Sequence, residues 1–122
     1  MPRNARSSKP LTPATFHILL SLTGPPIHGY RIKRMVEDRT DGSVRLGAGT
    51  LYAGIRRMVE GGLIEEREAP ADADVEPGAR WRFYAITEKG RTTLDAELDR
   101  MSSDLEAARS LLDDPSVSQQ SA

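Results

Sequence analysis

The stretch "GAGTLYAGIRRMVEGGLIEER", from Gly47 to Arg67, decides the fold because it joins a helical pattern directly to a strand pattern. Apolar side chains recur in it at the i, i+4, i+7 and i+8 spacing that places them on one face of a helix. These side chains are Leu51, Ile55, Met58 and Val59. Glycine adopts the left-handed conformation at low cost, so Gly61 and Gly62 end the helix and "LIEER" follows as a strand.

Length and composition limit the classes of protein to which the chain can belong. Its 122 residues suffice for one domain with a single core. No run approaches the roughly 20 apolar residues of a membrane helix, and the basic start "MPRNARSSKP" lacks the apolar segment of a signal peptide. We therefore expect a cytoplasmic protein that does not bind membranes.

The residues that usually carry catalysis or bind metals are scarce. The chain has no cysteine and only two histidines, His17 and His28, which excludes a disulfide framework and makes a zinc site unexpected. No nucleophile paired with a base and no phosphate-binding glycine loop is present. We expect no enzymatic activity, no metal and no cofactor. His28 is interpreted as a helix-start residue with a local hydrogen bond, and His17 as peripheral.

Charge is distributed unevenly along the chain although its net value is only -1. Residues 1 to 62 carry a net +6, residues 63 to 93 a net -2, and residues 94 to 122 a net -5. Phosphate attraction is local, because salt screens it over about 8 Å. The basic part therefore indicates one surface that meets a polyanion, unless surface charge is simply scattered unevenly.

Two helices are expected before the central stretch. Thr12 followed by Pro13 predicts a hydroxyl cap before proline at the first helical position, and "ATFHILLSL" continues that helix until "GPP" at residues 24 to 26. The second helix is expected from about His28 to Arg39. Its apolar face consists of Ile32, Met35 and Val36. The "SVRL" run at residues 43 to 46 is compatible with a short extended piece.

A hairpin follows the central helix. The run "RWRFYAI", from Arg80 to Ile86, predicts the return strand for "LIEER", and the acidic "EAPADADVEPGA" between them predicts a mobile tip. Trp81 and Phe83 alternate with Arg80 and Arg82. We interpret the two aromatic residues as core or interface rather than as base-stacking groups.

The last helix is predicted to follow Thr87 as its cap. Apolar residues spaced 4, 3, 4, 3 and 4 apart form a seam of the coiled-coil type along it. The seam residues are Leu94, Leu98, Met101, Leu105, Ala108 and Leu112. We expect this seam to make a homodimer interface, the alternative being that the helix packs on its own domain. Its acidic outer face should point away from DNA, and Pro115 should stop the helix.

These elements together predict a mainly α winged helix-turn-helix, an α+β fold with a three-helix core, a two-stranded wing and a long C-terminal helix. We expect a flexible basic tail at residues 1 to 10, a DNA-binding domain at 11 to 87, a dimerisation helix at 88 to 113, and a disordered tail at 114 to 122. The motifs "HGYRI", "GTLYAGIRRMVEGGLI" and "RFYAITEKG", in this order, also make the chain resemble the PadR-like transcriptional regulators from about Leu11 to Leu112.

The resemblance implies a dimeric DNA-binding regulator, usually a repressor, whose C-terminal helix makes the dimer and which often responds to a small-molecule effector near that interface. Two positions depart from the family pattern. Gly47 and Ala48 stand where Ser-Pro is common, which loses a hydroxyl cap. Gly54 lies inside the helix at a cost of about 1 kcal/mol relative to alanine, unless close approach of another helix requires it.

The candidate DNA-contacting residues follow from the central helix being the recognition helix. Short or hydrogen-bonding side chains suit base edges, and cations suit phosphates or guanine. The candidates are Thr50, Tyr52, Ala53, Arg56 and Arg57 on that helix, Lys33 and Arg34 on the second helix, and Arg80 and Arg82 in the wing. Plain solvation is the alternative for each charged side chain, and Tyr52 lies on the border of the apolar stripe.

The sequence therefore predicts a homodimeric, sequence-specific regulator of transcription that binds a pseudo-palindromic operator in double-stranded DNA. A small-molecule effector is a further expected partner. The alternative is a winged-helix module whose basic face meets an acidic protein within a larger assembly. A steep dependence of duplex binding on salt would distinguish the two.

Overall fold

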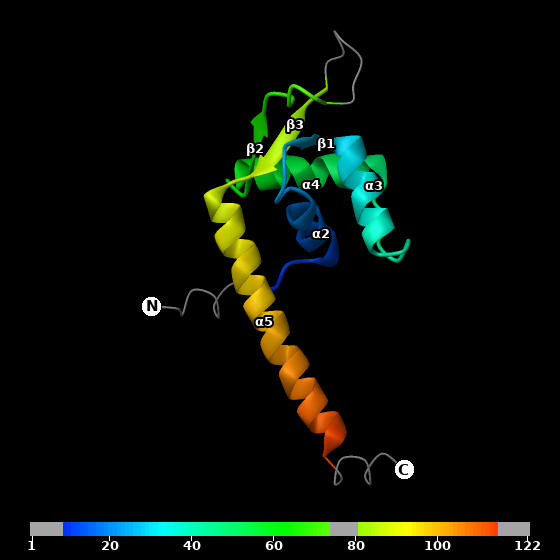
Figure 1. Ribbon diagram of the computed structural model, residues 1–122, viewed down its shortest axis with the longest axis vertical. Coiled ribbons are helices and arrows are strands. Elements are labelled where there is room, and N and C mark those ends of the chain that lie inside the picture. The colour runs from blue at the N-terminus through cyan, green and yellow to red at the C-terminus, as the bar shows by residue number, and fades with distance from the viewer. Residues whose placement is uncertain (1–8, 74–80, 115–122) are drawn as a thin grey trace.

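The computed structural model describes residues 9 to 73 and 81 to 114 and shows a winged helix with a long C-terminal helix (Figure 1). Its elements in chain order are α2 (Pro13–Ser21), β1 (Ile27–His28), α3 (Gly29–Arg39), α4 (Ala48–Glu60), β2 (Ile64–Arg67), β3 (Phe83–Ile86) and α5 (Glu88–Asp113). The predicted fold class is confirmed. Most of both predicted tails, and the part of the predicted hairpin tip from residue 74 to 79, lie outside the described residues.

Helix starts occur where the sequence places capping groups. The hydroxyl of Thr12 accepts a hydrogen bond from the Thr15 amide at 3.1 Å, and the hydroxyl of Thr87 accepts one from the Gly90 amide at 3.0 Å. These bonds satisfy amides that have no partner inside the helix. Helix α4 instead begins after Gly47 without a side-chain cap, as the glycine at that position predicts.

The sheet has three strands, so the predicted two-stranded wing is incomplete. The order is β1-β3-β2 with both pairs antiparallel, and Ile27 of β1 pairs with Tyr84 of β3. Ile27 and His28, which follow Pro25 and Pro26, are extended and pair with the free edge of β3. The second helix therefore begins at Gly29 and not at His28. The return strand is also shorter than predicted, since it begins at Phe83.

The chain between α3 and α4 forms a tight turn rather than the extended piece that "SVRL" suggested. Asp41 and Gly42 have positive φ values of 54° and 81°. The hydroxyl of Thr40 then accepts a hydrogen bond from the Val44 amide at 3.1 Å and donates one to the Val36 carbonyl at 2.8 Å. This turn carries the chain directly from the end of α3 into α4.

One hydrophobic core unites the helices with the sheet. Its buried members are Ile18, Leu19, Leu22, Ile32, Val36, Leu46, Leu51, Ile55, Met58, Ile64, Tyr84, Ile86 and Leu94. Burial of a side chain of this size stabilises the fold by roughly 1.5 to 3 kcal/mol. The predicted stripe of α4 is confirmed at three positions, but Val59 is 40% exposed. It lies at the edge of the stripe, on the side of α4 that faces the wing.

The C-terminal end of α4 is fastened to the start of α5. The Lys89 ammonium donates to the Gly61 carbonyl at 2.8 Å, and the Thr87 hydroxyl donates to the Gly62 carbonyl at 2.5 Å. The Thr87 amide donates to the Leu63 carbonyl at 3.0 Å. We call this set of contacts the α4–α5 joint. From it, α5 runs away from the domain so that its second half projects beyond the body (Figure 1).

Candidate nucleic-acid interface

Helix α4 has one buried face and one exposed face. Leu51, Ile55 and Met58 hold it against the core, whereas Thr50, Arg56 and Arg57 are exposed and Ala53 is partly exposed. Among the described residues, neither Arg56 nor Arg57 has an ion-pair partner. The face therefore offers two uncommitted guanidinium groups, which can bind a phosphate or the edge of a guanine.

Gly54 does not mark a close approach of another helix. A Cβ atom at this position would meet the Ile18 side chain at 3.7 Å and the Met58 side chain at 3.8 Å, which are ordinary packing distances. The glycine is buried but not sterically required. Its cost to helix stability is therefore not offset by tighter packing.

Tyr52 is half packed and half exposed, as its position at the border of the stripe predicts. Its exposed fraction is 48%, and its ring rests on Gly29 at the start of α3. A Cβ atom on Gly29 would lie 2.8 Å from the Tyr52 hydroxyl oxygen, so a larger residue at position 29 would displace the ring. Tyr52 thus connects α4 to α3 while one side of its ring stays open to solvent.

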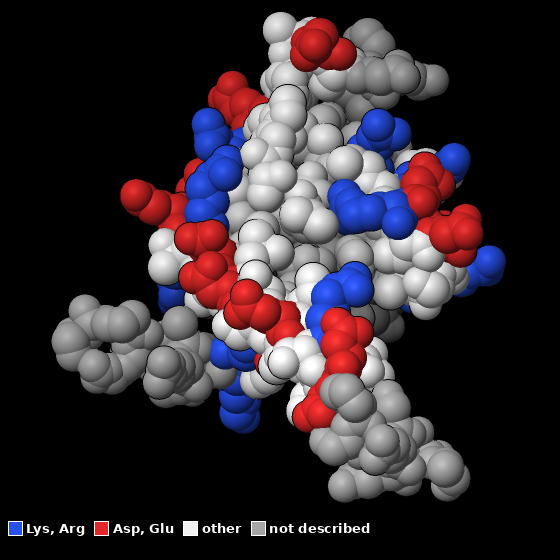
Figure 2. Space-filling model, turned by 60° about the horizontal axis from the view of Figure 1, so that its bottom comes forward, with Lys and Arg blue, Asp and Glu red and all other residues white. Residues whose placement is uncertain are grey.

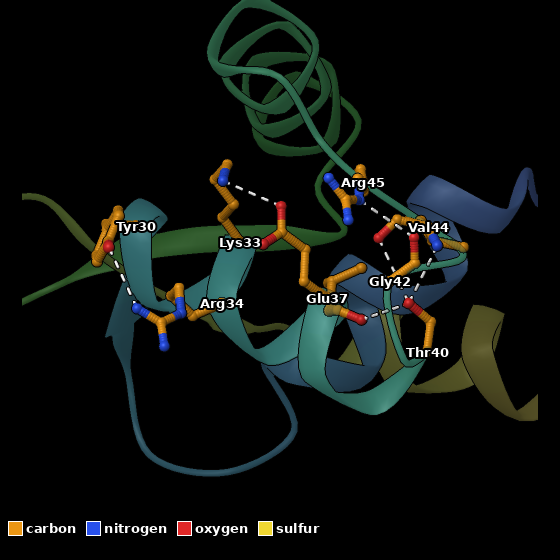
Figure 3. Close-up of polar contacts among 9 residues, drawn as sticks. Tyr30, Lys33, Arg34, Glu37, Thr40, Gly42, Val44 and Arg45 are labelled. Atoms are coloured by element: carbon orange, nitrogen blue, oxygen red, sulfur yellow. Dashed lines mark hydrogen bonds and ion pairs between the residues drawn. The ribbon is translucent and has the colours of Figure 1, made fainter.

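The two candidate cations of α3 differ in their availability. The Lys33 ammonium forms an ion pair with Glu37 at 3.0 Å, and both side chains are partly buried (Figure 3). Arg34 is exposed, and its guanidinium donates to the Tyr30 hydroxyl at 3.3 Å. Phosphate would therefore have to compete with Glu37 for Lys33. The hydrogen-bond partner of Arg34 is neutral, although Asp38 and Glu37 also attract its charge.

Arg45 was not among the predicted contacts, although it comes two residues before Gly47 at the start of α4. It is exposed, and its Nε donates to the Gly42 carbonyl at 3.4 Å. Figure 3 shows Arg45 and Lys33 extending toward the side on which α4 begins. The sequence signal that could have found it is a basic side chain in the turn of a helix-turn-helix, where the chain passes the DNA backbone.

Of the two cations predicted to act from the wing, one lies within the described residues. Arg82 is exposed and lies 3.7 Å from Glu66 on the neighbouring strand, in an ion pair that water screens. Arg80, the other predicted wing contact, lies outside the described residues. The structure therefore places Arg82 beside β2 and does not test Arg80.

His28 organises the aromatic side chains at the base of the wing. Its Nδ1 accepts a hydrogen bond from the Arg31 amide at 3.1 Å and so caps α3, as predicted. The ring centroids of His28 and Trp81 are 4.4 Å apart, and Phe83 approaches edge-on at 5.4 Å. Burial and the nearby Arg31 lower the pKa of His28. Phe83 is buried as expected, but Trp81 is 45% exposed.

The predicted seam of α5 divides into two parts. Leu94 is buried in the core of its own chain, so at this position the alternative of packing on its own domain holds. The next position lies where α5 leaves the body, and burial of the seam ends there. The exposed members are Leu98, Met101, Leu105, Ala108 and Leu112. A row of exposed leucines is costly in water and is usually covered by a partner.

Glu97 ties α5 to the chain before α2. Its carboxylate is buried, accepts from the Leu11 amide at 3.3 Å and pairs with Arg100 at 2.7 Å. The hydrogen bond from Arg100 holds the pKa of this carboxyl below its usual value despite burial. Other acidic side chains form a row along α5, beside uncharged surface (Figure 2).

Two other classes of site are absent from the parts of the chain that the structure describes. No group of three or more potential metal ligands occurs in residues 9 to 73 and 81 to 114. No helix within the same ranges is long and apolar enough to cross a membrane.

Comparison with known proteins decides the family. The model of the transcriptional regulator PadR-like family matches residues 18–96. The chain belongs to this family. No curated protein matches the PadR-like chain. The family match ends at residue 96, so the exposed part of the α5 seam lies entirely beyond it.

Several solved structures share the fold. A PadR family transcription regulator from Clostridium difficile is 21% identical, with a TM-score of 0.66 over 83% of this chain and 99% of that chain. A PadR-like regulator from Bacillus cereus is also 21% identical, with a TM-score of 0.66 over 82% and 91%. Bacillus subtilis PadR, solved in complex with operator DNA, is 19% identical, with a TM-score of 0.59 over 74% and 48%. Identities this low support the fold alone.

Proposed function

We propose that this PadR-like chain is a homodimeric repressor that binds a pseudo-palindromic operator in double-stranded DNA. The observation that carries the proposal is the exposed face of α4, where two arginines without ion-pair partners among the described residues stand on a helix fixed by its buried side. A major groove admits one such helix, and a rigid helix does not have to be ordered on binding. The complex of Bacillus subtilis PadR with operator DNA supports a DNA partner for this fold.

Each group in the interface has a role in the proposal. Thr50 and Ala53 are short enough to let the start of α4 approach the base edges, with Tyr52 beside them. Arg56 and Arg57 bind guanine or phosphate. The remaining candidate cations neutralise phosphates; they are Lys33, Arg34, Arg45, Arg80 and Arg82.

Dimerisation supplies the second recognition helix. One helix reads only a few base pairs, so two are needed about 34 Å apart along one face of the duplex. The exposed seam from Leu98 to Leu112 is the surface that would hold two copies together, because it is apolar and projects from the body. Each buried leucine contributes roughly 1.5 to 3 kcal/mol to the association. The α4–α5 joint then fixes α4 relative to the dimer axis.

The proposal includes an effector that relieves repression. Only the resemblance to the PadR-like family supports this part of the proposal. Helix α5 from Glu88 to Asp113 contains no aromatic residue, so it offers no ring on which a flat effector could stack. A flat effector would have to bind at another surface of the protein.

Selection of bound fragments from a random duplex library tests the proposed function. The expected result is an enriched sequence with two related half-sites, and a binding constant that falls with salt by about 0.9 log unit per log unit for each neutralised phosphate. Absence of enrichment together with weak salt dependence would instead support the winged-helix module that meets an acidic protein.

A further inference from the structure

A concave surface lies between α4 and the wing. It is an open groove with a volume of about 600 Å³, within the size range of small-molecule sites. Its walls come from three parts of the fold: the wing-facing side of α4, the junction of β1 and α3, and the strands of the wing. No predicted role accounts for this groove, and we call it the wing groove.

Aromatic side chains with open faces line the wing groove. Tyr52 and Trp81 are each about half exposed, and each is held from behind. Gly29 supports the ring of Tyr52, and His28 supports that of Trp81. Val59 adds an apolar surface, which accounts for its exposure in a helix whose other stripe residues are buried. Fixed aromatic and apolar walls favour a flat ring, because stacking there requires little reordering of side chains.

The charged side chains of the wing groove balance one another. Arg56 and Arg82 can only donate hydrogen bonds, whereas Glu60 and Glu66 can only accept them when ionised. Two positive and two negative charges leave no net preference for an anion or a cation. A ligand whose edge carries both acceptors and donors would satisfy both kinds of side chain.

We propose that the wing groove binds an uncharged planar heteroaromatic molecule with hydrogen-bond donors and acceptors on its edge, of which a purine nucleoside is a representative. The ring stacks between the aromatic walls, and its edge faces the arginines and glutamates at the rim. A net charge on the ligand weakens binding, because the balanced rim gives it no net attraction to offset the cost of removing the charge from water.

The ligand would also regulate DNA binding, and this consequence rests on the proposed function. Tyr52, Arg56 and Arg82 belong both to the wing groove and to the proposed DNA-contacting set. A molecule bound there occupies the space beside the exposed face of α4 and engages Arg56. Ligand and operator therefore compete for the same side chains, without any change at the dimer interface.

Trp81 provides a direct test because it is the only tryptophan in the chain. Adenosine is titrated into the full-length protein without DNA while tryptophan emission is recorded, and calorimetry measures the affinity. The expected result is a saturable change in emission with a dissociation constant on the order of 10 to 1,000 µM. Two charged flat probes, 2-naphthoate and N-methylquinolinium, should bind about tenfold more weakly. No saturable binding of adenosine, or tighter binding of either charged probe, would overturn the proposal.

Two variants separate the groove from other surfaces. Val59→Phe fills the groove and should weaken adenosine binding about tenfold or more, whereas Leu111→Phe enlarges an exposed apolar residue on α5 and should not. Circular dichroism confirms that both variants are folded. Equal affinity of Val59→Phe and the native chain would place the ligand elsewhere.

A competition arm distinguishes failure of the groove from failure of the proposed function. Adenosine that binds and also displaces a selected operator duplex supports both proposals. If adenosine binds without displacing the duplex, the wing groove is a ligand site, but the proposed location of DNA on α4 is contradicted. A duplex that changes Trp81 emission while adenosine has no effect would show that the groove serves DNA alone, and the small-molecule site would be rejected.

Discussion

Replacing Gly90 with alanine should be far more damaging than its position on the surface helix α5 suggests. A Cβ atom there would overlap the Leu63 carbonyl oxygen and lie 2.7 Å from the Ile86 side chain. The obstruction is backbone, which cannot rotate away. Insertion of a methyl group into such a site typically costs 1 to 3 kcal/mol. The shift would also strain the bond from Lys89 to the Gly61 carbonyl, worth about 1 kcal/mol.

The total expected loss is therefore about 2 kcal/mol, because the better helix propensity of alanine offsets about 1 kcal/mol. In a chain of this size that corresponds to a melting temperature lower by about 8 °C. Thermal unfolding followed by circular dichroism measures it. Gly49→Ala is the matched control, because it also lies in a helix but nothing stands within 4 Å of its added Cβ. A melting temperature of Gly90→Ala equal to or above that of the control would refute the close approach at the α4–α5 joint.

Three further predictions concern the dimer, the cap of α3 and the phosphate contacts. Leu98→Asp combined with Leu105→Asp should give a monomer in sedimentation that has lost operator binding but keeps weak, salt-sensitive attraction to DNA; a persistent dimer would mean that assembly uses another surface. Because burial lowers the pKa of His28 below its usual 6.5, its contribution to stability should be present above pH 6.5 and be lost as the pH falls below that value. His28→Asn keeps a capping side chain without a titrating ring, so urea unfolding at pH 7.5 and 5.5 should show a smaller pH effect in this variant, and an equal effect would exclude His28 as the source. Lys33→Ala should weaken binding to all duplexes alike and reduce the salt slope by about one unit, whereas a loss confined to one base position would contradict a phosphate contact.

Most of the fold could be predicted from local signals. Hydroxyl and proline caps, the apolar spacing of α4 and the glycine pair after it placed three helices and the first wing strand close to their observed bounds. These signals are local because capping and helix amphipathicity depend on residues a few positions apart. Strand β1 could not be found in this way. It has only two residues, and they are extended because they pair with the free edge of β3. This pairing joins residues that are far apart in the sequence.

Only part of the candidate site could be predicted from the sequence. Exposure of Thr50, Arg56 and Arg57 followed from periodicity, but the ion pair of Lys33 with Glu37 required knowledge of side-chain conformations. Leu94 fits the seam by spacing yet faces its own core, because the first turns of α5 lie on the domain and the later turns do not. Spacing alone cannot tell which partner covers an apolar face. The wing groove likewise depends on how the wing folds back beside α4.

The central claim is that the exposed face of α4 reads DNA, and the affinity of the Arg57→Ala variant for a selected operator tests it most directly. Arg109→Ala on α5 serves as the control, because it removes the same charge from an exposed helix distant from α4 in sequence. The account predicts that Arg57→Ala weakens operator binding by about 1 to 3 kcal/mol with an unchanged melting temperature, while Arg109→Ala has little effect. Equal affinities of the two variants for the operator would contradict it.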